Sequence, residues 1–306
     1  MKRQDFIKQS FLLTAGSLFA VNGFSRGLSV PGEKVTIMYT NDTHARIDPF
    51  PSNAVEHAGL GGVSKRAALI KRIREDSPYN LLLDAGDVFH GTPWFNVFGG
   101  EKDFRLMSKM GYDAMCLGNH EFDNGLDGFA EVAPAAKFPI LCANYRVQNT
   151  PMGPFVRQFI VRERAGLRVG IFGLGIRLRG LVKPELYGDI RYANPVAWAN
   201  RLVEHLREVH RCHYIICLSH LGYRYEDDRI DDRKLASQLN GIDLIIGGHT
   251  HTFLDQPESI ARPDGDVTLV TQAGHSGIRL GRIDLSLNGY GDIENVIAHQ
   301  YTIGSA

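Results

Sequence analysis

Five short apolar runs in this chain each lead into a cluster of Asp, Asn and His residues, and this pattern constrains the fold more than any other feature. The apolar runs alternate with longer stretches of helical periodicity, which is typical of layered α/β proteins. Because ligands of such proteins bind beyond the carboxyl ends of the strands, we expect the five clusters to lie at one place. The clusters are Asn41-Asp42-Thr43-His44, Asp84-Ala85-Gly86-Asp87, Gly118-Asn119-His120-Glu121-Phe122-Asp123, Ser219-His220-Leu221-Gly222 and Gly247-Gly248-His249-Thr250-His251.

The expected helices and strands fill the chain without a dividing linker, so we expect one α/β domain over residues 33–306. Helices are expected at Val63–Glu75, Lys102–Met110 and Pro195–Val209, the last capped by Asn194. Strands are expected at Val35–Thr40, Asn80–Asp84, Ala114–Leu117, Ile140–Ala143, Leu167–Leu174, Tyr214–Ser219, Leu244–Gly247, Thr268–Gln272 and Arg282–Leu287.

The charge balance limits the classes of partner. The 306 residues carry 34 basic and 34 acidic side chains, so the formal net charge is zero. A chain without a basic excess lacks the charge that binds a phosphate backbone, and no nucleic-acid partner is expected. The four cysteines are too scattered for a disulfide framework and are expected to be buried free thiols. They are Cys116, Cys142, Cys212 and Cys217.

The first 30 residues have the three-part layout of an export signal. Lys2, Arg3 and Lys8 precede an apolar stretch, Phe11–Val21, and a small, polar run follows. The apolar stretch is shorter than the roughly 20 residues that span a bilayer, so no stable membrane anchor is expected. The start resembles a twin-arginine motif in which Gln4 replaces the second arginine. We expect a periplasmic or secreted protein; the alternative is an amphipathic first helix.

The spacing of the polar residues suits metal binding. Asp42 and His44 alternate on one extended strand end, so both side chains can face the same metal ion. His249 and His251 repeat that spacing. The carboxylate of Asp87 has two oxygens that could bridge two ions. These residues therefore indicate a site for more than one metal.

The remaining polar residues narrow the chemistry. Asn119 adds a carbonyl oxygen and His220 another imidazole. Oxygen and imidazole ligands without a thiolate suit Mn, Fe, Zn or Co. Two such ions about 3.5–4 Å apart would clamp a phosphoryl group and lower the pKa of a bridging water. The residues thus indicate hydrolysis of a phosphoester.

Five sequence motifs give the chain a family resemblance that extends from Val35 to Gln300. They are Tyr-Thr-Asn-Asp-Thr-His, Leu-Leu-Asp-Ala-Gly-Asp, Leu-Gly-Asn-His-Glu-Phe-Asp, Leu-Ser-His-Leu-Gly and Ile-Ile-Gly-Gly-His-Thr-His. In order and spacing the chain resembles the calcineurin-like metallophosphoesterases, and within them the catalytic domain of bacterial 5′-nucleotidases. The resemblance implies a layered αββα sandwich that holds two divalent metal ions.

The resemblance also implies a role for each site residue. It assigns one ion to Asp42, His44, Asp87 and His251, and the other to Asp87, Asn119, His220 and His249, with Asp87 as the bridge. His120 would stabilise the phosphoryl transition state or protonate the leaving oxygen, and Asp123 would hold its imidazole. The residues agree with the last point, because side chains three positions apart meet if the segment turns helically.

Other residues near the motifs have weaker assignments. Glu121 is expected to be a structural hydrogen-bond partner, and Asp84 could support its loop. His275 could approach the mouth of the site, whereas His90 and the other histidines outside the motifs are expected to be solvated or locally bonded. Four aromatic residues could stack on a base or line the rim of the sheet: Trp94, Phe95, Tyr223 and Tyr225.

The bacterial 5′-nucleotidases continue into a second domain that contacts the nucleoside, whereas this chain stops at Ala306. We therefore expect either recognition by the catalytic domain alone or a separately encoded nucleotide-binding domain. The expected function is an exported dinuclear-metal phosphohydrolase acting on nucleoside monophosphates. The alternatives are a cyclic-nucleotide phosphodiesterase or other small phosphoester hydrolase and, in a different class, a metal-containing binding subunit without catalysis.

Overall fold

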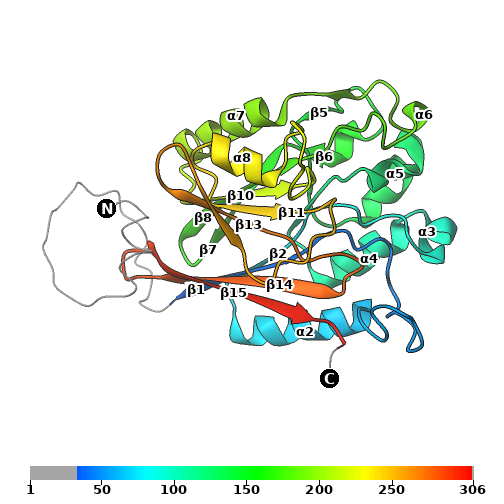
Figure 1. The fold of residues 1–306 in the computed structure, drawn as a ribbon, viewed down its shortest axis with the longest axis horizontal. Coiled ribbons are helices and arrows are strands. Elements are labelled where there is room, and N and C mark those ends of the chain that lie inside the picture. The colour runs from blue at the N-terminus through cyan, green and yellow to red at the C-terminus, as the bar shows by residue number, and fades with distance from the viewer. Residues whose placement is uncertain (1–32, 305–306) are drawn as a thin grey trace, which may run out of the picture.

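The computed structural model describes residues 33–304, which form two stacked sheets between layers of helices (Figure 1). In spatial order the first sheet contains β15 (Ile293–Thr302), β14 (Arg279–Leu287), β1 (Lys34–Thr40), β2 (Asn80–Asp84), β3 (Ala114–Cys116), β4 (Ile140–Leu141) and β6 (Val156–Arg157). The second contains β12 (Glu258–Ala261), β13 (Val267–Thr271), β11 (Leu244–Gly247), β10 (Tyr214–Ser219), β8 (Leu167–Leu174) and β7 (Phe159–Arg164). A small ribbon pairs β5 (Tyr145–Arg146) with β9 (Arg191–Tyr192).

Helices cover the outer face of each sheet (Figure 1). On the first sheet lie α2 (Val63–Asp76), α3 (Pro93–Phe98), α4 (Glu101–Met110), α5 (Gly125–Val132) and the short α6 (Pro184–Tyr187). On the second lie α7 (Pro195–Glu208) and α8 (Asp232–Gln238). Single turns of 3₁₀-helix occur at η1 (His120–Phe122), η2 (Ala133–Ala135) and η3 (Gly153–Phe155).

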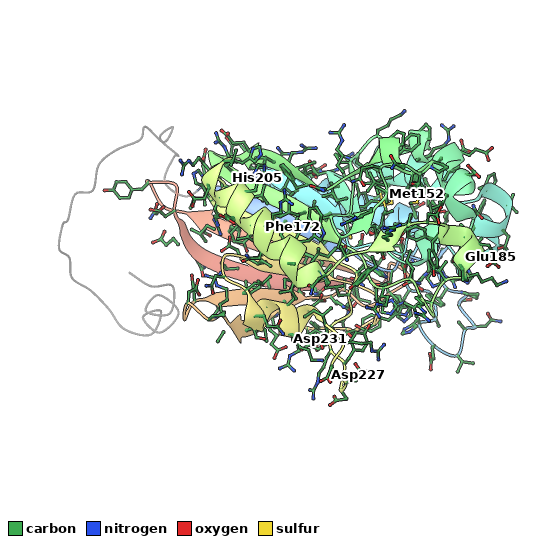
Figure 2. The ribbon with its side chains drawn as sticks, turned by 90° about the horizontal axis from the view of Figure 1, so that it is seen from above. Met152, Phe172, Glu185, His205, Asp227 and Asp231 are labelled. Carbon is green, nitrogen blue, oxygen red and sulfur yellow. The ribbon has the colours of Figure 1, made fainter. Side chains whose placement is uncertain are left out.

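Alternating side chains along the strands build the layers. Ile37 and Tyr39 of β1 are buried between the sheets, whereas Met38 packs with the helices on the outer face. In the second sheet, Ile171 faces the first sheet, and Phe172 packs on the other side with residues of α7. Figure 2 shows Phe172 and the helix that carries His205. The order of layers is therefore helix, sheet, sheet, helix, as the fold-class prediction stated.

Both sheets have a parallel centre. β1, β2, β3, β4 and β6 are parallel neighbours, as are β8, β10, β11 and β13. The pairings of β14 with β1, of β15 with β14, of β7 with β8 and of β12 with β13 are antiparallel. The carboxyl ends of the strands that precede the five polar clusters therefore share an edge within each sheet.

All nine expected strands are present, with ends shifted by at most three residues; β14, for example, begins at Arg279 rather than Arg282. Six strands were not expected: β5, β7, β9, β12 and β15, which pair antiparallel, and β6, which pairs parallel to β4. β15 is mostly exposed, so its side chains lack the apolar pattern by which strands are found. α7 begins at Pro195, and the side chain of Asn194 accepts hydrogen bonds from the N–H groups of Val196 and Ala197, as expected of a cap.

Three further expectations can be compared with the structure. All four cysteines are buried and free, as predicted. Within residues 33–304, the helices are too short or too polar to cross a membrane. The export signal expected over residues 1–30 lies outside the described residues.

Candidate functional site

The loops that follow five parallel strands meet at one edge of the two sheets. The N–H of Asp42 donates to the carbonyl of Gly86 at 2.8 Å, and the N–H of His44 donates to that of Asp87 at 3.1 Å. The N–H of His249, in the other sheet, donates to the Asp42 carboxylate at 3.0 Å. The predicted ligands brought together are Asp42 and His44 after β1, Asp87 after β2, Asn119 after β3, His220 after β10, and His249 and His251 after β11.

The first group of side chains consists of Asp42, His44 and His251, whose ligand atoms lie within 4.8 Å of one another. Nε2 of His251 is 3.3 Å from Oδ1 of Asp42 and 2.9 Å from Nε2 of His44. Asp42 is completely buried, whereas the two imidazoles are partly accessible. The group thus has a buried acid at its base and an opening toward solvent.

The second group consists of Asp87, His220 and His249. Nε2 of His220 lies 2.9 Å from Oδ2 of Asp87, and both side chains are buried. Oδ1 of Asn119 lies 2.9 Å from Nδ1 of His249, which brings the amide to this group. The two groups adjoin, because Nε2 of His220 is also 3.9 Å from Oδ1 of Asp42.

The backbone at the ligand positions is left-handed, not extended as the sequence analysis expected. The φ angles are 49° at Asp42 and His44, 55° at Asp87, 71° at His249 and 54° at His251. β-Carbon crowding makes this conformation costly for residues other than glycine, on the order of 1–3 kcal/mol each. The chain ends each strand before its ligands and turns sharply, so that neighbouring loops can direct their side chains to a common centre.

Two glycines allow the loops to approach closely. A β-carbon on Gly118 would lie 2.2 Å from Oδ1 of Asp87. One on Gly248 would lie 2.9 Å from Nδ1 of His220 and 3.0 Å from Oδ2 of Asp42. A side chain at either position would therefore displace a predicted ligand.

The donor atoms fit a cation. Nδ1 of His220 lies 2.7 Å from the carbonyl oxygen of Ala85, so it carries a hydrogen and donates it. In the neutral ring Nε2 then has only a lone pair, yet it faces an oxygen of Asp87 at 2.9 Å. Two acceptors come this close only if positive charge lies between them.

The pKa shifts of His220 and Asp87 also indicate a positive charge between the two side chains. Burial alone would lower the pKa of His220, but the charge of Asp87, its hydrogen bond and the charge of Asp42 outweigh burial and raise the pKa above its usual value. Burial would likewise raise the pKa of Asp87, but His220 holds it below its usual range. The pair therefore stabilises a positive charge at its centre, which a proton or a metal ion can supply.

His120 and Asp123 meet beside the metal-ligand groups, as the three-residue spacing predicted. Nδ1 of His120 donates to Oδ2 of Asp123 at 2.7 Å across η1. The N–H of His120 also donates to Oδ1 of Asp87 at 2.8 Å. Burial alone would lower the pKa of His120, but Asp123 and Asp87 raise it above its usual value. His120 is therefore well placed to carry a proton next to the site.

Buried carboxylates hold the loops in place. Glu121 is completely buried, and its oxygens accept the N–H groups of Asp87 at 3.0 Å, Val88 at 2.8 Å, Phe89 at 3.3 Å and Gly118 at 2.6 Å. This agrees with the structural role expected for it. Asp84 similarly accepts the N–H of Gly86, in its own loop, at 2.8 Å.

Two histidines outside the sequence motifs also lie near the site. His275 contacts His251, with ring centroids 5.1 Å apart, in line with the expected approach to the mouth. His90 was expected to be solvated or locally bonded, and its side chain is 56% exposed. Its Nδ1 also lies 2.9 Å from Oδ2 of Asp123, in a different loop. No motif signals this contact, because the two residues belong to separate segments of the chain.

The aromatic residues identified from the sequence have their rings or hydroxyls engaged within the chain. Phe95 is buried, and Trp94 stacks on Phe98 with a centroid distance of 5.7 Å. The hydroxyl of Tyr223 donates to a carboxylate at 2.6 Å, and a guanidinium carbon lies 4.0 Å from the centroid of Tyr225. These contacts indicate that the four aromatic residues line the rim of the sheet and do not offer a free surface on which a base could stack.

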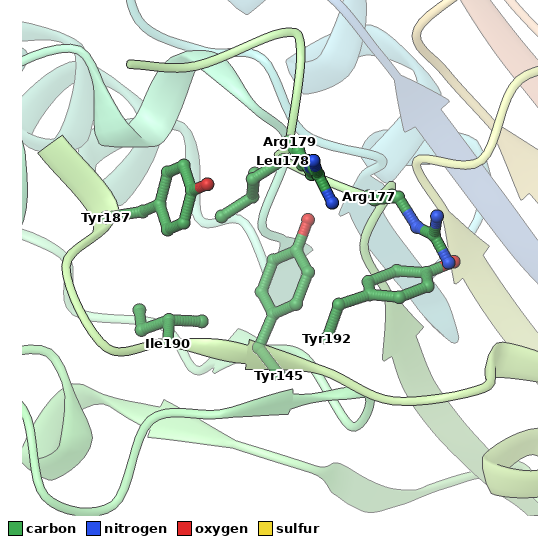
Figure 3. Close-up of a pocket in the computed structure, with 7 residues that line it drawn as sticks. All are labelled: Tyr145, Arg177, Leu178, Arg179, Tyr187, Ile190 and Tyr192. Atoms are coloured by element: carbon green, nitrogen blue, oxygen red, sulfur yellow. The ribbon is translucent and has the colours of Figure 1, made fainter. Parts of the chain in front are cut away.

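A groove that was not expected from the sequence is lined by residues of β5, β9 and the segment that follows β8 (Figure 3). The guanidinium of Arg177 lies over Tyr192, 5.6 Å from the ring centroid. A second hollow of about 590 Å³ shares these two residues and reaches Leu221, which follows His220 in the chain. The first hollow, of about 320 Å³, is lined by Tyr145, Arg177, Leu178, Arg179, Tyr187, Ile190 and Tyr192.

Both ends of this groove adjoin elements that carry predicted site residues. Tyr145 contacts Phe122 of η1, with ring centroids 5.7 Å apart. Within residues 33–304, neither Arg177 nor Arg179 forms an ion pair with a carboxylate. The groove thus combines aromatic rings with two guanidinium groups that form no ion pair in this part of the chain, a combination that suits an anionic ligand with a flat ring.

Known proteins share this architecture. The trifunctional nucleotide phosphoesterase protein YfkN of Bacillus subtilis (strain 168) is 33% identical over 85% of this chain and 18% of its own length. The 5′-nucleotidase of Rattus norvegicus is 32% identical over 85% of this chain and 47% of its own length. The crystal structure of the 5′-nucleotidase precursor from Thermus thermophilus has a TM-score of 0.78 at 31% identity, covering 88% of this chain and 54% of that one.

The chain therefore spans about half the length of the rat and Thermus proteins and less than a fifth of the Bacillus protein. Residues 35–253, which include every predicted ligand, match the family profile described as calcineurin-like phosphoesterase. Since that match covers most of the chain and several relatives exceed 30% identity along it, the protein belongs to the calcineurin-like phosphoesterases, which are metal-dependent phosphoester hydrolases.

Proposed function

We propose that this chain hydrolyses phosphomonoesters with two divalent ions and that nucleoside monophosphates are its substrates. The observation that carries the proposal is the pair of adjoining acid–imidazole groups, in the second of which Nε2 of His220 and an oxygen of Asp87 face each other and require positive charge between them. The proposed ligands, all from the sequence prediction, are Asp42, His44, Asp87, Asn119, His220, His249 and His251. Mn, Fe, Zn and Co all suit such a set.

The chain's own groups supply positioning and a proton. Bound divalent ions contribute Lewis acidity toward phosphoryl oxygens and lower the pKa of a water molecule. His120 lies at the side of the ligand groups and directs Nδ1–H to Asp123, so in its protonated form the ring can donate the Nε2 hydrogen to a phosphoryl or leaving oxygen. Asp123 holds the orientation of the imidazole and favours its protonated form.

Two observations support a nucleotide as the substrate. The rat and Thermus relatives are named 5′-nucleotidases. In addition, the groove at Arg177 and Tyr192 starts next to the site and combines a guanidinium with an aromatic ring. We propose that the leaving nucleoside lies along this groove, with its base against Arg177 and Tyr192.

A panel of phosphoesters tests the proposal. The purified chain, loaded in turn with Mn, Zn, Co or Fe, should release phosphate from AMP, and chelation should abolish the activity until metal is restored. Two bound ions without phosphate release from any ester would instead indicate the binding subunit. A preference for AMP over p-nitrophenyl phosphate above about a hundredfold, or roughly 2.7 kcal/mol, would show that this chain recognises the nucleoside itself. Comparable kcat/KM values would favour the separate nucleotide-binding domain.

A phosphodiester substrate is the second candidate. The Bacillus relative is named a trifunctional nucleotide phosphoesterase, so the similarity does not single out monoesters. Cyclic nucleotides belong in the same panel. Faster turnover of a cyclic nucleotide than of AMP would replace the monoesterase proposal with a phosphodiesterase.

We also propose that the protein is exported to the periplasm or secreted. The support is the cationic start and the apolar stretch Phe11–Val21. N-terminal sequencing of protein from the native envelope fraction should give a start between about residues 20 and 33, at the end of the three-part signal. An intact Met1 in a cytoplasmic fraction would refute export.

A further inference from the structure

One imidazole beside the candidate site is absent from the predicted set of site residues. Nδ1 of His90 lies 2.9 Å from Oδ2 of Asp123, and the same oxygen lies 2.7 Å from Nδ1 of His120. Nδ1 of His120 makes a hydrogen bond to this oxygen, and Nδ1 of His90 approaches the same atom as a close polar contact. His90 and His120 therefore share Asp123.

The two imidazoles are also stacked. The ring centroids of His90 and His120 are 4.7 Å apart, and the planes differ by 21°. The ring of His44 approaches His120 edge-on, with a centroid distance of 5.2 Å and an angle of 76°. His120 is thus confined by a hydrogen bond, a stacked ring and a ring edge, and His90 takes part in two of these three constraints.

Burial does not explain an imidazole at this position. The side chain of His90 is 56% exposed, so it adds little to the core. Its φ of 69° is left-handed, which glycine adopts with less strain. The loop is nevertheless fixed on both sides: Glu121 accepts the N–H of Phe89, and a β-carbon on Gly91 would lie 2.9 Å from that of His44. The side chain of His90 therefore has a defined direction, toward Asp123.

We propose that His90 is a positioning residue, which orients His120 through the carboxylate that they share. The inference rests on the proposed hydrolase function. The close polar contact of His90 fixes the place of the Asp123 carboxylate, and the stacked ring limits the tilt of His120. Both effects keep Nε2 of His120 in one direction relative to the phosphoryl group. His90 acts without touching the substrate.

Two substitutions separate the polar contact of His90 with Asp123 from the stacking on His120. His90→Phe keeps a flat ring but removes the donor. His90→Asn keeps a donor near the position of Nδ1, and asparagine tolerates left-handed backbone. We expect His90→Phe to lower kcat for AMP about tenfold, at the low end for residues that orient a site group. KM and the two bound ions should be unchanged, and His90→Asn should recover most of kcat.

A matched control exists in an imidazole pair on the second sheet's side of the molecule. His210 contacts His205, with ring centroids 4.9 Å apart, at the end of α7. His210→Asn removes one ring of a comparable pair and should leave kcat and KM at wild-type values. If His210→Asn lowered kcat as much as His90→Phe does, the loss would not depend on contact with His120. That result would overturn the inference.

A second readout is independent of turnover. In the metal-loaded protein, the low-field NMR signal of the His120 Nδ1–H should shift or broaden in His90→Phe and persist in His90→Asn. Unchanged kcat and an unchanged signal in His90→Phe would overturn the inference. So would a third equivalent of metal in the wild type that is lost in both variants, since the three side chains would then be ligands. If the wild type hydrolyses no phosphoester, the proposed function fails, whereas the NMR comparison still tests the positioning.

Discussion

The two parts of the candidate site are built in opposite ways. The metal-ligand groups draw side chains from five loops in two sheets around the buried Asp42, Asp87 and His220, and they require left-handed backbone at Asp42, Asp87 and three further positions. His120 and Asp123 come from one turn of 3₁₀-helix, and their side chains are 30% and 22% exposed. The first part depends on the whole fold, whereas the second depends on local sequence. Substitutions in the first part should therefore reduce metal binding, whereas substitutions in the second should reduce kcat and leave the metal bound.

The largest effect is expected from Asp87→Ala. Its buried carboxylate contacts His220 and accepts the N–H of His120, so its loss disturbs both parts of the site. Metal analysis should show less bound metal than after substitution of a more exposed ligand such as His251, and activity should fall to background. Retention of two equivalents of metal per chain would contradict the bridging role of Asp87.

His120→Ala should separate the chemistry from metal binding. Because no predicted ligand is removed, both ions should remain, while kcat falls roughly 10²–10⁴-fold, the usual range for a positioned acid or base. Asp123→Asn should cause a smaller loss, since it changes only the group that orients the imidazole. The measurement is steady-state kinetics with AMP alongside metal analysis. Unchanged turnover with a poor leaving group would reassign the acid.

Substitutions in the groove should alter substrate preference and leave the chemistry intact. Tyr192→Ala should raise KM for AMP about tenfold, since base stacking contributes on the order of 1–3 kcal/mol. The kinetics with p-nitrophenyl phosphate should not change. Arg201→Ala is the control, because its guanidinium lies 5.5 Å from the ring centroid of Trp198, on the outer helix α7. An equal effect of both substitutions would exclude the groove as the nucleoside site.

The smallest effect is expected far from the site, at the cap of α7. Asn194→Ala removes the acceptor for two N–H groups and should lower the free energy of unfolding by about 1 kcal/mol. Urea denaturation measures this loss, and kcat/KM should stay at the wild-type value. A change in kcat/KM would mean that the outer helix layer influences the geometry of the candidate site.

The sequence predicted the parts of the molecule that follow from strand pattern and local spacing. The apolar runs predicted the parallel strands, and therefore the edge at which Asp42, Asp87 and His220 meet. The three-residue spacing predicted the contact of His120 with Asp123. In each case the physical cause lies within a short segment or follows from the geometry of parallel sheets.

The remaining features depend on long-range packing. The left-handed backbone of the ligand loops is imposed by contacts with other loops, such as the hydrogen bonds from four N–H groups to Glu121. The contact of His90 with Asp123 and the groove at Arg177 and Tyr192 join segments that share no motif. The antiparallel strand β15 is mostly exposed, and its composition does not distinguish it from a loop.

The joining of distant segments also determines when the site can form. Nε2 of His44 and Nε2 of His251 are 207 positions apart in the chain, as are the Asp42 carboxylate and the N–H of His249 that donates to it. Closing so long a loop is slow, and these contacts need both sheets docked. We therefore expect the site to be completed late in folding. Ions that bind only the completed site slow unfolding and leave the early steps of refolding unchanged.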